Sequence, residues 1–289
     1  GRIYGFLIPK LPEDRYHKGK SLQSVAQTAS GVVAVFEDGS TESGDLLIGA
    51  DGARSMVRDY VTGGGIERTY SGYTNFNGLV AQDAAIGPAN QWTTYVGDGK
   101  RCAVMPVAGD RFYFFVDIPQ PAGHAAEAGE PLAALREAFG DWAPGVQTLL
   151  EAIDPASSLN RVEIWDIDPF HTWVKGRVAI LGDAAHNTAP DIGQGACSAL
   201  EDTFALAISL ATNTNSVEDA LLRYERSRTE RAGDLVNRAR KRAAETHGFV
   251  PGATEAWYES LRGTDGTDII RGIVGNIEGS PINLGVGSL

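Results

Sequence analysis

The chain has little that would attach it to a metal, a membrane or a nucleic acid. Its 289 residues include two cysteines, Cys102 and Cys197, and five histidines, and neither type shows the spacing of a metal site. No apolar run approaches the ~20 residues that cross a bilayer, and no signal peptide is visible. A net charge of −12 and an isoelectric point near 4.9 disfavour nucleic acids and anionic membranes as partners. Two cysteines without a CxxC motif favour a cytoplasmic protein without a metal.

What the sequence does contain is centred on residues 177–202. Residues 177–181 are mostly β-branched and apolar, which predicts a buried strand. A glycine-rich loop follows, with Asp183 at its start and Gly193-Gln194-Gly195 at its end, and apolar residues then recur at helical spacing. In α/β sheets this order places a loop and a helix N-terminus over the carboxyl ends of strands, where ligands bind. Backbone N–H groups and the helix dipole favour an anion there, and Asp183 can accept from sugar hydroxyls.

A second strand–turn–helix pattern lies earlier in the chain. The apolar residues 46–49 precede Asp51-Gly52, and Ser55 and Arg58 fall in the first turns of the helix that follows. The residues alone leave open whether this is a binding site or a plain βα turn.

Together the two patterns resemble the class A flavoprotein monooxygenases, a family similar to p-hydroxybenzoate hydroxylase. GDAAH, a proline, GQG and a small-residue helix ending in Glu-Asp match its second flavin-binding motif, and Asp51-Gly52 with Ser55 and Arg58 matches its DG motif. The resemblance implies FAD as cofactor, NADH or NADPH as co-substrate, and O2. It places Asp183 at the ribitol and pyrophosphate, Gly193-Gln194-Gly195 beside the isoalloxazine, and Asp51 near FAD. Arg2 falls where the family has an arginine that touches the flavin.

The first motif of that family is missing. No GxGxxG, which in the family holds the FAD pyrophosphate, occurs in this chain, and the chain starts with Gly1 rather than Met. On a βαβ layout roughly 100 residues would precede Gly1. We therefore expect a fragment of a longer protein that binds FAD weakly or not at all by itself; the alternative is a truncated, non-catalytic chain.

The periodicities predict an α/β (α+β two-domain) fold. Residues 1–65 and 161–250 are expected to form the two parts of a Rossmann-like FAD-binding domain, N-terminally incomplete. Residues 66–160 are expected to form an inserted, mainly antiparallel β-sheet substrate domain, and residues 251–289 a C-terminal helical segment. Residues 2–14 are interpreted as a broken helix or loop.

Individual elements follow from the same patterns. One or two long helices are expected over 216–245, and Trp257 and Tyr258 are expected to dock into the core. The strand at 162–167 is expected to return toward the strand at 177–181. The other expected strands are 16–27, 32–37, 45–49, 91–96, 101–107 and 112–118, and the other expected helices are 130–138 and 146–153.

The substrate is suggested by the inserted domain. Its segments 72–79, 90–106, 111–119, 140–144 and 160–170, with 246–248 and 255–258, resemble the FAD-dependent urate hydroxylases of bacterial purine catabolism. The resemblance implies that urate is hydroxylated at C5 to 5-hydroxyisourate. Arg101 would then donate to the urate carbonyl oxygens, Tyr113 would supply a hydroxyl, and Asp191 would orient Arg101.

Other interpretations of these residues stay open. Without the resemblance, Arg101 suits a surface position after a turn, Tyr113 a core strand, and Asp191 a loop cap. His186 is interpreted as a packing residue of its motif. A second candidate function is hydroxylation of a small aromatic acid such as a salicylate or nicotinate derivative, with Arg101 binding its carboxylate. The oligomeric state is not indicated.

Overall fold

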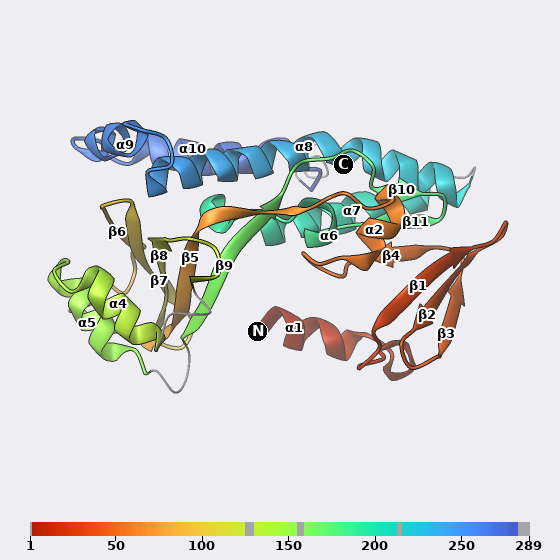
Figure 1. Cartoon of the computed structure of the whole chain (residues 1–289), viewed down its shortest axis with the longest axis horizontal. Coiled ribbons are helices and arrows are strands. Elements are labelled where there is room, and N and C mark those ends of the chain that lie inside the picture. Colours follow the sequence, from red (N-terminus) through yellow and green to blue (C-terminus); the bar gives the residue numbers. More distant parts are fainter. Residues whose placement is uncertain (1, 125–129, 155–158, 213–215, 283–289) are drawn as a thin grey trace.

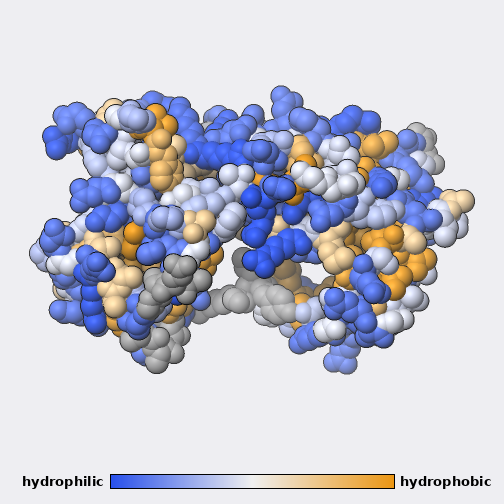
Figure 2. Space-filling view, viewed as in Figure 1, coloured by the Kyte–Doolittle hydropathy of each residue, from blue (hydrophilic) through white to orange (hydrophobic). Residues whose placement is uncertain are grey.

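The computed structural model describes residues 2–124, 130–154, 159–212 and 216–282, with side chains from Gly5 onward. Two groups of elements lie along one long helix, α8 (Val217–His247), which extends over both of them (Figure 1). An antiparallel sheet lies under one end of α8, and a smaller α/β unit lies under the other. The surface is hollowed between these two lobes, below α8 (Figure 2). The fold is thus the α/β two-domain arrangement that the sequence predicts.

The α/β unit is built on two parallel strands. β4 (Leu47–Gly49) pairs in parallel with β11 (Val178–Ile180), and β10 (Val174–Lys175) pairs antiparallel with the other edge of β11. Helix α2 (Met56–Thr62) packs closely on β4, because Gly49 has no side chain where Val57 lies. Parallel strands end on the same side of a sheet, so the loops carrying Asp51 and Asp183 lie together, as expected for a ligand site.

The amino-terminal segment differs in part from the expectation. It is a broken helix, α1 (Arg2–Leu7) followed by the short turns η1 (Ile8–Lys10) and η2 (Glu13–Arg15). A three-stranded meander of β1 (Leu22–Gln27), β2 (Val32–Phe36) and β3 (Thr41–Gly44) comes next. The strand expected from residue 16 begins only at residue 22, because Gly19 has a φ of +72° that ends any extended run before it. The fully exposed β3 was not expected, since it lacks an apolar alternation.

The second sheet has five antiparallel strands in the order β6-β7-β8-β5-β9. They are β5 (Arg68–Ala81), β6 (Thr93–Gly97), β7 (Lys100–Val107), β8 (Arg111–Pro119) and β9 (Asn160–Ile167). Helices α4 (Pro131–Phe139) and α5 (Pro144–Ala152) cover its outer face (Figure 1). They bury one apolar core with the strands, which includes Phe76, Phe112, Phe114, Leu135 and Leu149.

The place of β9 corrects one prediction. It does not return to the strand at 177–181 but pairs with β5, from Arg68 opposite Ile167 to Asn77 opposite Asn160. The reason is that β11 already has β10 and β4 on its two edges and offers no free edge. The antiparallel sheet therefore extends to residue 167, past the domain boundary expected at 160.

The carboxyl-terminal part is helical. α7 (Gly195–Thr212) and α8 pack against each other, and the region 216–245 is one helix, capped by the Ser216 side chain. α9 (Ala253–Leu261) and α10 (Thr267–Ile277) follow, and residues 283–289 of the expected helical segment lie outside the described residues. Within the described ranges, no helix is long and apolar enough to cross a bilayer.

The prediction that Trp257 and Tyr258 dock into the core is wrong. Both are only half-buried. The Trp257 ring lies 4.0 Å from the Arg242 guanidinium, and the Tyr258 hydroxyl accepts a hydrogen bond from the Gly99 backbone N–H. The cation–π contact of Trp257 ties α9 to α8, and the Tyr258 hydroxyl ties it to the β6–β7 turn.

Candidate active site

The inner face of the five-stranded sheet is polar. In β8, Phe112, Phe114 and Val116 point into the core under α4 and α5, so the alternate residues point to the other face. The register places Asp117 of β8 opposite Arg101 of β7 and opposite Asn75 of β5. The described side chains that share this inner face include Tyr73, Asn75, Asn77, Arg101, Tyr113, Phe115 and Asp117.

Arg101 lies between two carboxylates on this face. Its Nε and Nη2 atoms are 2.7 and 2.6 Å from Oδ2 of Asp117, and Nη2 is 3.1 Å from Oδ1 of Asp191. Burial disfavours the charge on Arg101, but the two carboxylates outweigh it, so that its pKa is raised. Its remaining nitrogen, Nη1, has no acceptor among the described residues. The guanidinium is thus held rigidly and keeps free donors.

Asp191 reaches this cluster from the glycine-rich loop. It lies in the turn η3 (Pro190–Ile192), and its side chain is fully buried. Oδ1 accepts from Arg101, and Oδ2 accepts from the Tyr73 hydroxyl at 2.5 Å. Burial raises the pKa of Asp191, although Arg101 and Tyr73 favour its charged form. The predicted pairing of Arg101 with Asp191 is therefore present in the structure, across 90 positions in sequence.

Tyr113 lies on the same face but apart from this pair. It is opposite Met105, and its ring centroid is 6.2 Å from that of Phe115, which in turn lies 5.1 Å from the Arg101 guanidinium. Burial raises the pKa of the Tyr113 hydroxyl. The tyrosine that bonds directly to Asp191 is Tyr73 instead.

Four residues of the cluster were missed from the sequence: Tyr73, Asn75, Asp117 and His247. A signal existed for two of them. Asn75 and Asn77 flank the apolar Phe76 in a segment expected to be a strand, and Asp117 is a carboxylate within a strand of aromatic and branched residues. Asn75 donates to Asp117 at 2.6 Å, which completes the hydrogen bonding of that buried carboxylate.

The loop between β11 and α7 offers free acceptors and donors. Asp183 begins the short helix α6 (Asp183–His186); it is exposed, and its carboxylate has no partner among the described residues. Gly193 is exposed at a φ of +67°, with open space where a side chain would lie. The 18-residue helix α7 begins two residues later, so its first N–H groups point into the loop. A sugar hydroxyl chain at Asp183 and a flat ring over Gly193 fit these groups, which is the chemistry of FAD.

The DG motif has a structural role of its own. Ser55 caps α2 by accepting from the Arg58 backbone N–H, and the Asp51 carboxylate supports this cap by accepting from the Ser55 hydroxyl and the Val57 backbone N–H. Arg58 is buried and donates to the carbonyls of Ala53 and Ala184, which joins this motif to α6. Asp51 is nevertheless exposed and near the Asp183 loop. Arg2 is the first residue of α1, and its side chain lies outside the described part of the chain.

A buried ionic network holds the loop from below. Nε2 of His186 is 2.6 Å from Oδ2 of Asp202, which also accepts from the Gly182 backbone N–H. Oδ1 of Asp202 accepts from Nε of the fully buried Arg228, whose Nη1 is 2.8 Å from Glu201. The interpretation of His186 as a packing residue is therefore incomplete, because it is a hydrogen-bonded member of this network.

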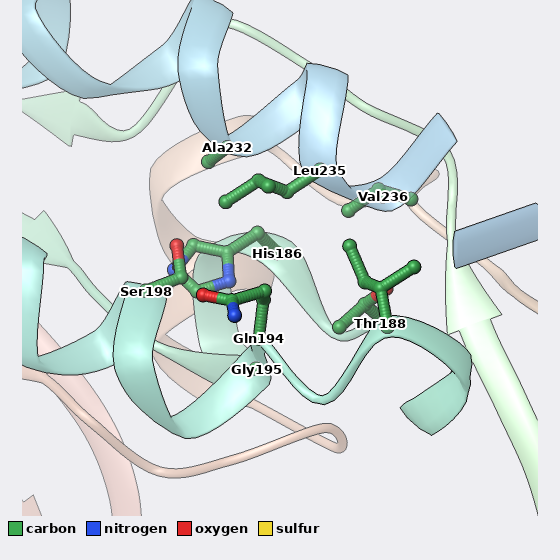
Figure 3. A pocket seen from close by; sticks show the side chains of 9 residues that line it. His186, Thr188, Gln194, Gly195, Ser198, Ala232, Leu235 and Val236 are labelled. Carbon is green, nitrogen blue, oxygen red and sulfur yellow. Dashed lines mark hydrogen bonds between the residues drawn. The ribbon is translucent and has the colours of Figure 1, made fainter. Parts of the chain in front are cut away.

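Figure 3 shows this region under α8, where His186, Gln194 and Ser198 face Ala232, Leu235 and Val236. The space between them is about 10 Å³. It holds one water molecule at most. It is therefore part of the support of the loop and too small for a substrate.

Comparisons with known proteins identify the family of this chain. A family described as "FAD binding domain" matches residues 13–239. A FAD-dependent urate hydroxylase from Mycolicibacterium vanbaalenii is 59% identical over 253 residues, covering 88% of this chain and 64% of that protein. One from Klebsiella oxytoca is 48% identical over 269 residues, covering 93% of this chain and 70% of that protein.

A solved structure gives the same result. The crystal structure of Klebsiella pneumoniae HpxO complexed with FAD and uric acid has a TM-score of 0.92 and 46% identity, and covers 97% of this chain and 72% of that chain. The present chain thus spans roughly two thirds of the length of these relatives. The chain belongs to the family of the FAD-dependent urate hydroxylases.

Proposed function

We propose that the protein carrying this chain is a FAD-dependent monooxygenase that hydroxylates urate at C5 to 5-hydroxyisourate, using NADH or NADPH and O2. The observation that carries the proposal is Arg101, held between two buried carboxylates with free Nη1 donors on the inner face of the sheet. Urate is a polar, planar heterocycle with carbonyl oxygens, and a rigid guanidinium suits it better than an apolar slot. The urate hydroxylases named above support the choice of substrate.

In this proposal, some residues bind the cofactor and others bind the substrate. Asp183 and the loop Gly193-Gln194-Gly195 hold FAD, and Asp51 and Arg2 complete its surroundings. Bound FAD would supply the chemistry that activates O2. Arg101 binds and orients urate through Nη1, Asp191 orients Arg101, and Tyr113 donates or accepts one further hydrogen bond. The comparison of urate with salicylate as stimulants of NADH oxidation tests the proposal. A cytoplasmic location is also proposed, from the two unpaired cysteines.

Asp183 provides a first test of the cofactor site. Asp183→Ala is expected to lower FAD affinity about tenfold or more, because a carboxylate–hydroxyl bond contributes roughly 1.5–3 kcal/mol. The change should alter the urate KM much less, since the exposed Asp183 has no contact with Arg101, whereas the buried Asp191 pairs with it. FAD content after purification and the urate KM at saturating FAD are the two measurements. Equal FAD content in the variant and the original protein would contradict the assignment.

Tyr113 provides a test of substrate positioning. Tyr113→Phe removes one neutral hydrogen bond, roughly 0.5–1.5 kcal/mol, so urate affinity should fall about tenfold or less. The larger effect is expected on coupling, because a misplaced urate lets activated oxygen leave as hydrogen peroxide. Peroxide formed per NADH oxidised measures this.

The control for Tyr113 is Tyr95→Phe. The Tyr95 hydroxyl donates to the Ile86 carbonyl on the core side of the sheet. Its loss should leave coupling unchanged. If both variants form peroxide in the same proportion, Tyr113 has no specific role.

A further inference from the structure

His247 is a buried histidine that the proposed mechanism does not yet use. It is the last residue of α8, and its ring stacks on that of Tyr73 with centroids 4.2 Å apart. Its Nδ1 atom is 2.8 Å from the carbonyl oxygen of Gly99, in the turn before Arg101. A carbonyl oxygen only accepts, so Nδ1 carries a hydrogen and donates it. In the neutral ring, Nε2 is then a bare acceptor.

That acceptor faces a second acceptor. Nε2 of His247 is buried, has no hydrogen-bond partner among the described residues, and lies 3.9 Å from Oδ1 of Asp191. An unsatisfied buried nitrogen is unfavourable, and two lone pairs that face each other are no better. One proton on either atom would convert this gap into a hydrogen bond. When the ring is neutral and the carboxylate is ionised, no hydrogen lies between Nε2 of His247 and Oδ1 of Asp191. The geometry therefore favours one added proton there.

The charges of the cluster also favour the uptake of one proton. Arg101 contributes one positive charge against the two negative charges of Asp117 and Asp191, which leaves a buried net charge of about −1. Arg242 of α8 also interacts electrostatically with Arg101 and Asp191, but its Nη1 lies 3.8 Å from the carboxylate of Glu245, so these two residues add no net charge. The other titratable groups around His247 are the hydroxyls of Tyr73 on β5 and Tyr258 on α9. One added proton would neutralise the buried cluster.

Burial acts on both members of the pair. It lowers the pKa of His247, although Asp117 and Asp191 oppose this, and it raises the pKa of Asp191. The two groups are thereby brought toward the same pH range, where a proton belongs to the pair rather than to one residue.

We propose that His247 and Asp191 share one proton between Nε2 and Oδ1, and that the pair takes up this proton when the urate anion binds beside Arg101. The inference rests on the proposed function. The proton comes from solvent, one N–H or O–H bond forms, and no bond of urate breaks. His247 is a positioning residue, because it acts on the charge next to Arg101 without touching urate.

The first experiment measures proton uptake on binding. Urate is titrated into the FAD-loaded protein without NADH, by calorimetry in two buffers of different ionisation enthalpy, between pH 6 and 8. We expect uptake of up to about one proton per urate, and an affinity that falls up to about tenfold per pH unit above the midpoint of the pair. The sign follows because binding favours the protonated pair, which is lost as pH rises. Urate that binds without proton uptake would overturn the linkage.

Two variants separate this role from a structural one. In His247→Gln the side-chain amide is a permanent donor to Asp191, so proton uptake and the pH dependence of affinity should disappear. A residue that only supports the turn would weaken binding equally at every pH and keep the slope. Tyr258→Phe is the control, because it loosens the same turn by removing the acceptor of the Gly99 N–H. Its slope should be unchanged.

The second experiment does not depend on urate. In NMR of the histidine ring Cε1–H groups, the signal that is missing in His247→Gln identifies His247. In Asp191→Asn its titration midpoint should move to lower pH, because a carboxylate that favours the charged ring is gone. An unchanged midpoint would overturn the shared proton. If urate fails to bind but the midpoint moves, the proposed function is wrong and the shared proton is supported.

Discussion

Arg101→Gln is expected to weaken urate binding about a hundredfold. The guanidinium offers charge-assisted donors, and the loss of two such bonds at roughly 1.5 kcal/mol each amounts to about 3 kcal/mol, or a factor of about 100 in affinity. Glutamine is chosen over alanine because its amide nitrogen takes about the position of Arg101 Nε and keeps a donor for the buried carboxylate of Asp117. Urate affinity, measured with the FAD-loaded protein, is the readout. An unchanged affinity and unchanged coupling in this variant would remove Arg101 from the urate site.

The pairing of Arg101 with Asp191 is tested with a second single variant and a double variant. Asp191→Asn should also weaken urate binding, because Arg101 loses one of its two anchors. The loss of binding free energy in the double variant should be clearly smaller than the sum of the two single losses, since the two side chains are 3.1 Å apart and act together. Arg111→Gln is the control, because among the described residues the side chain of this exposed arginine at the start of β8 donates only to the Ala108 carbonyl. It should bind urate normally.

Arg228→Met is expected to reduce the free energy of unfolding by about 3–5 kcal/mol, the usual cost of breaking a buried ion pair from one side. Arg228 is fully buried, and its loss leaves the carboxylates of Asp202 and Glu201 with fewer partners in the protein interior. The network beneath the glycine-rich loop would be affected first, because Asp202 also holds His186 and Gly182. A lower urea midpoint with an unchanged slope is the expected observation.

The control for Arg228 is an exposed ion pair. Arg262 lies 2.9 Å from Glu259, with both side chains more than 70% exposed. Arg262→Met should change the stability by about 1 kcal/mol or less, because solvent screens such pairs. If Arg228→Met has the same small effect, the buried network does not stabilise the loop.

The parts of the fold that were predictable are those with local signals. The period-two alternation of β8 and the strand–glycine–helix pattern after residue 177 define their elements without reference to the rest of the chain. The position of β9 was not predictable in this way, because it depends on which strand has a free edge. Trp257 was misplaced for a similar reason. Its burial depends on Arg242, fifteen positions away on another helix, and apolar character alone does not show this.

The candidate site was predictable only where a motif named it. Arg101, Tyr113 and Asp191 were found through the resemblance, but their geometry was not, since Tyr113 proves to be separated from Arg101 by Phe115. Asp117 and His247 lie within two segments of the resemblance, 111–119 and 246–248, but neither residue was given a role there. They become recognisable once the sheet register and the end of α8 place them within hydrogen-bond or charge range of Arg101 and Asp191.

The central claim is that urate is the substrate, and it is tested most directly by comparing two compounds in one assay. The FAD-loaded protein is mixed with NADH and O2, and NADH oxidation is followed with urate, with salicylate and with neither. We predict that urate stimulates oxidation strongly, is consumed in proportion and yields 5-hydroxyisourate, while salicylate has little effect. Stimulation and hydroxylation of salicylate, with urate inert, would contradict the assignment and identify Arg101 as a carboxylate-binding residue.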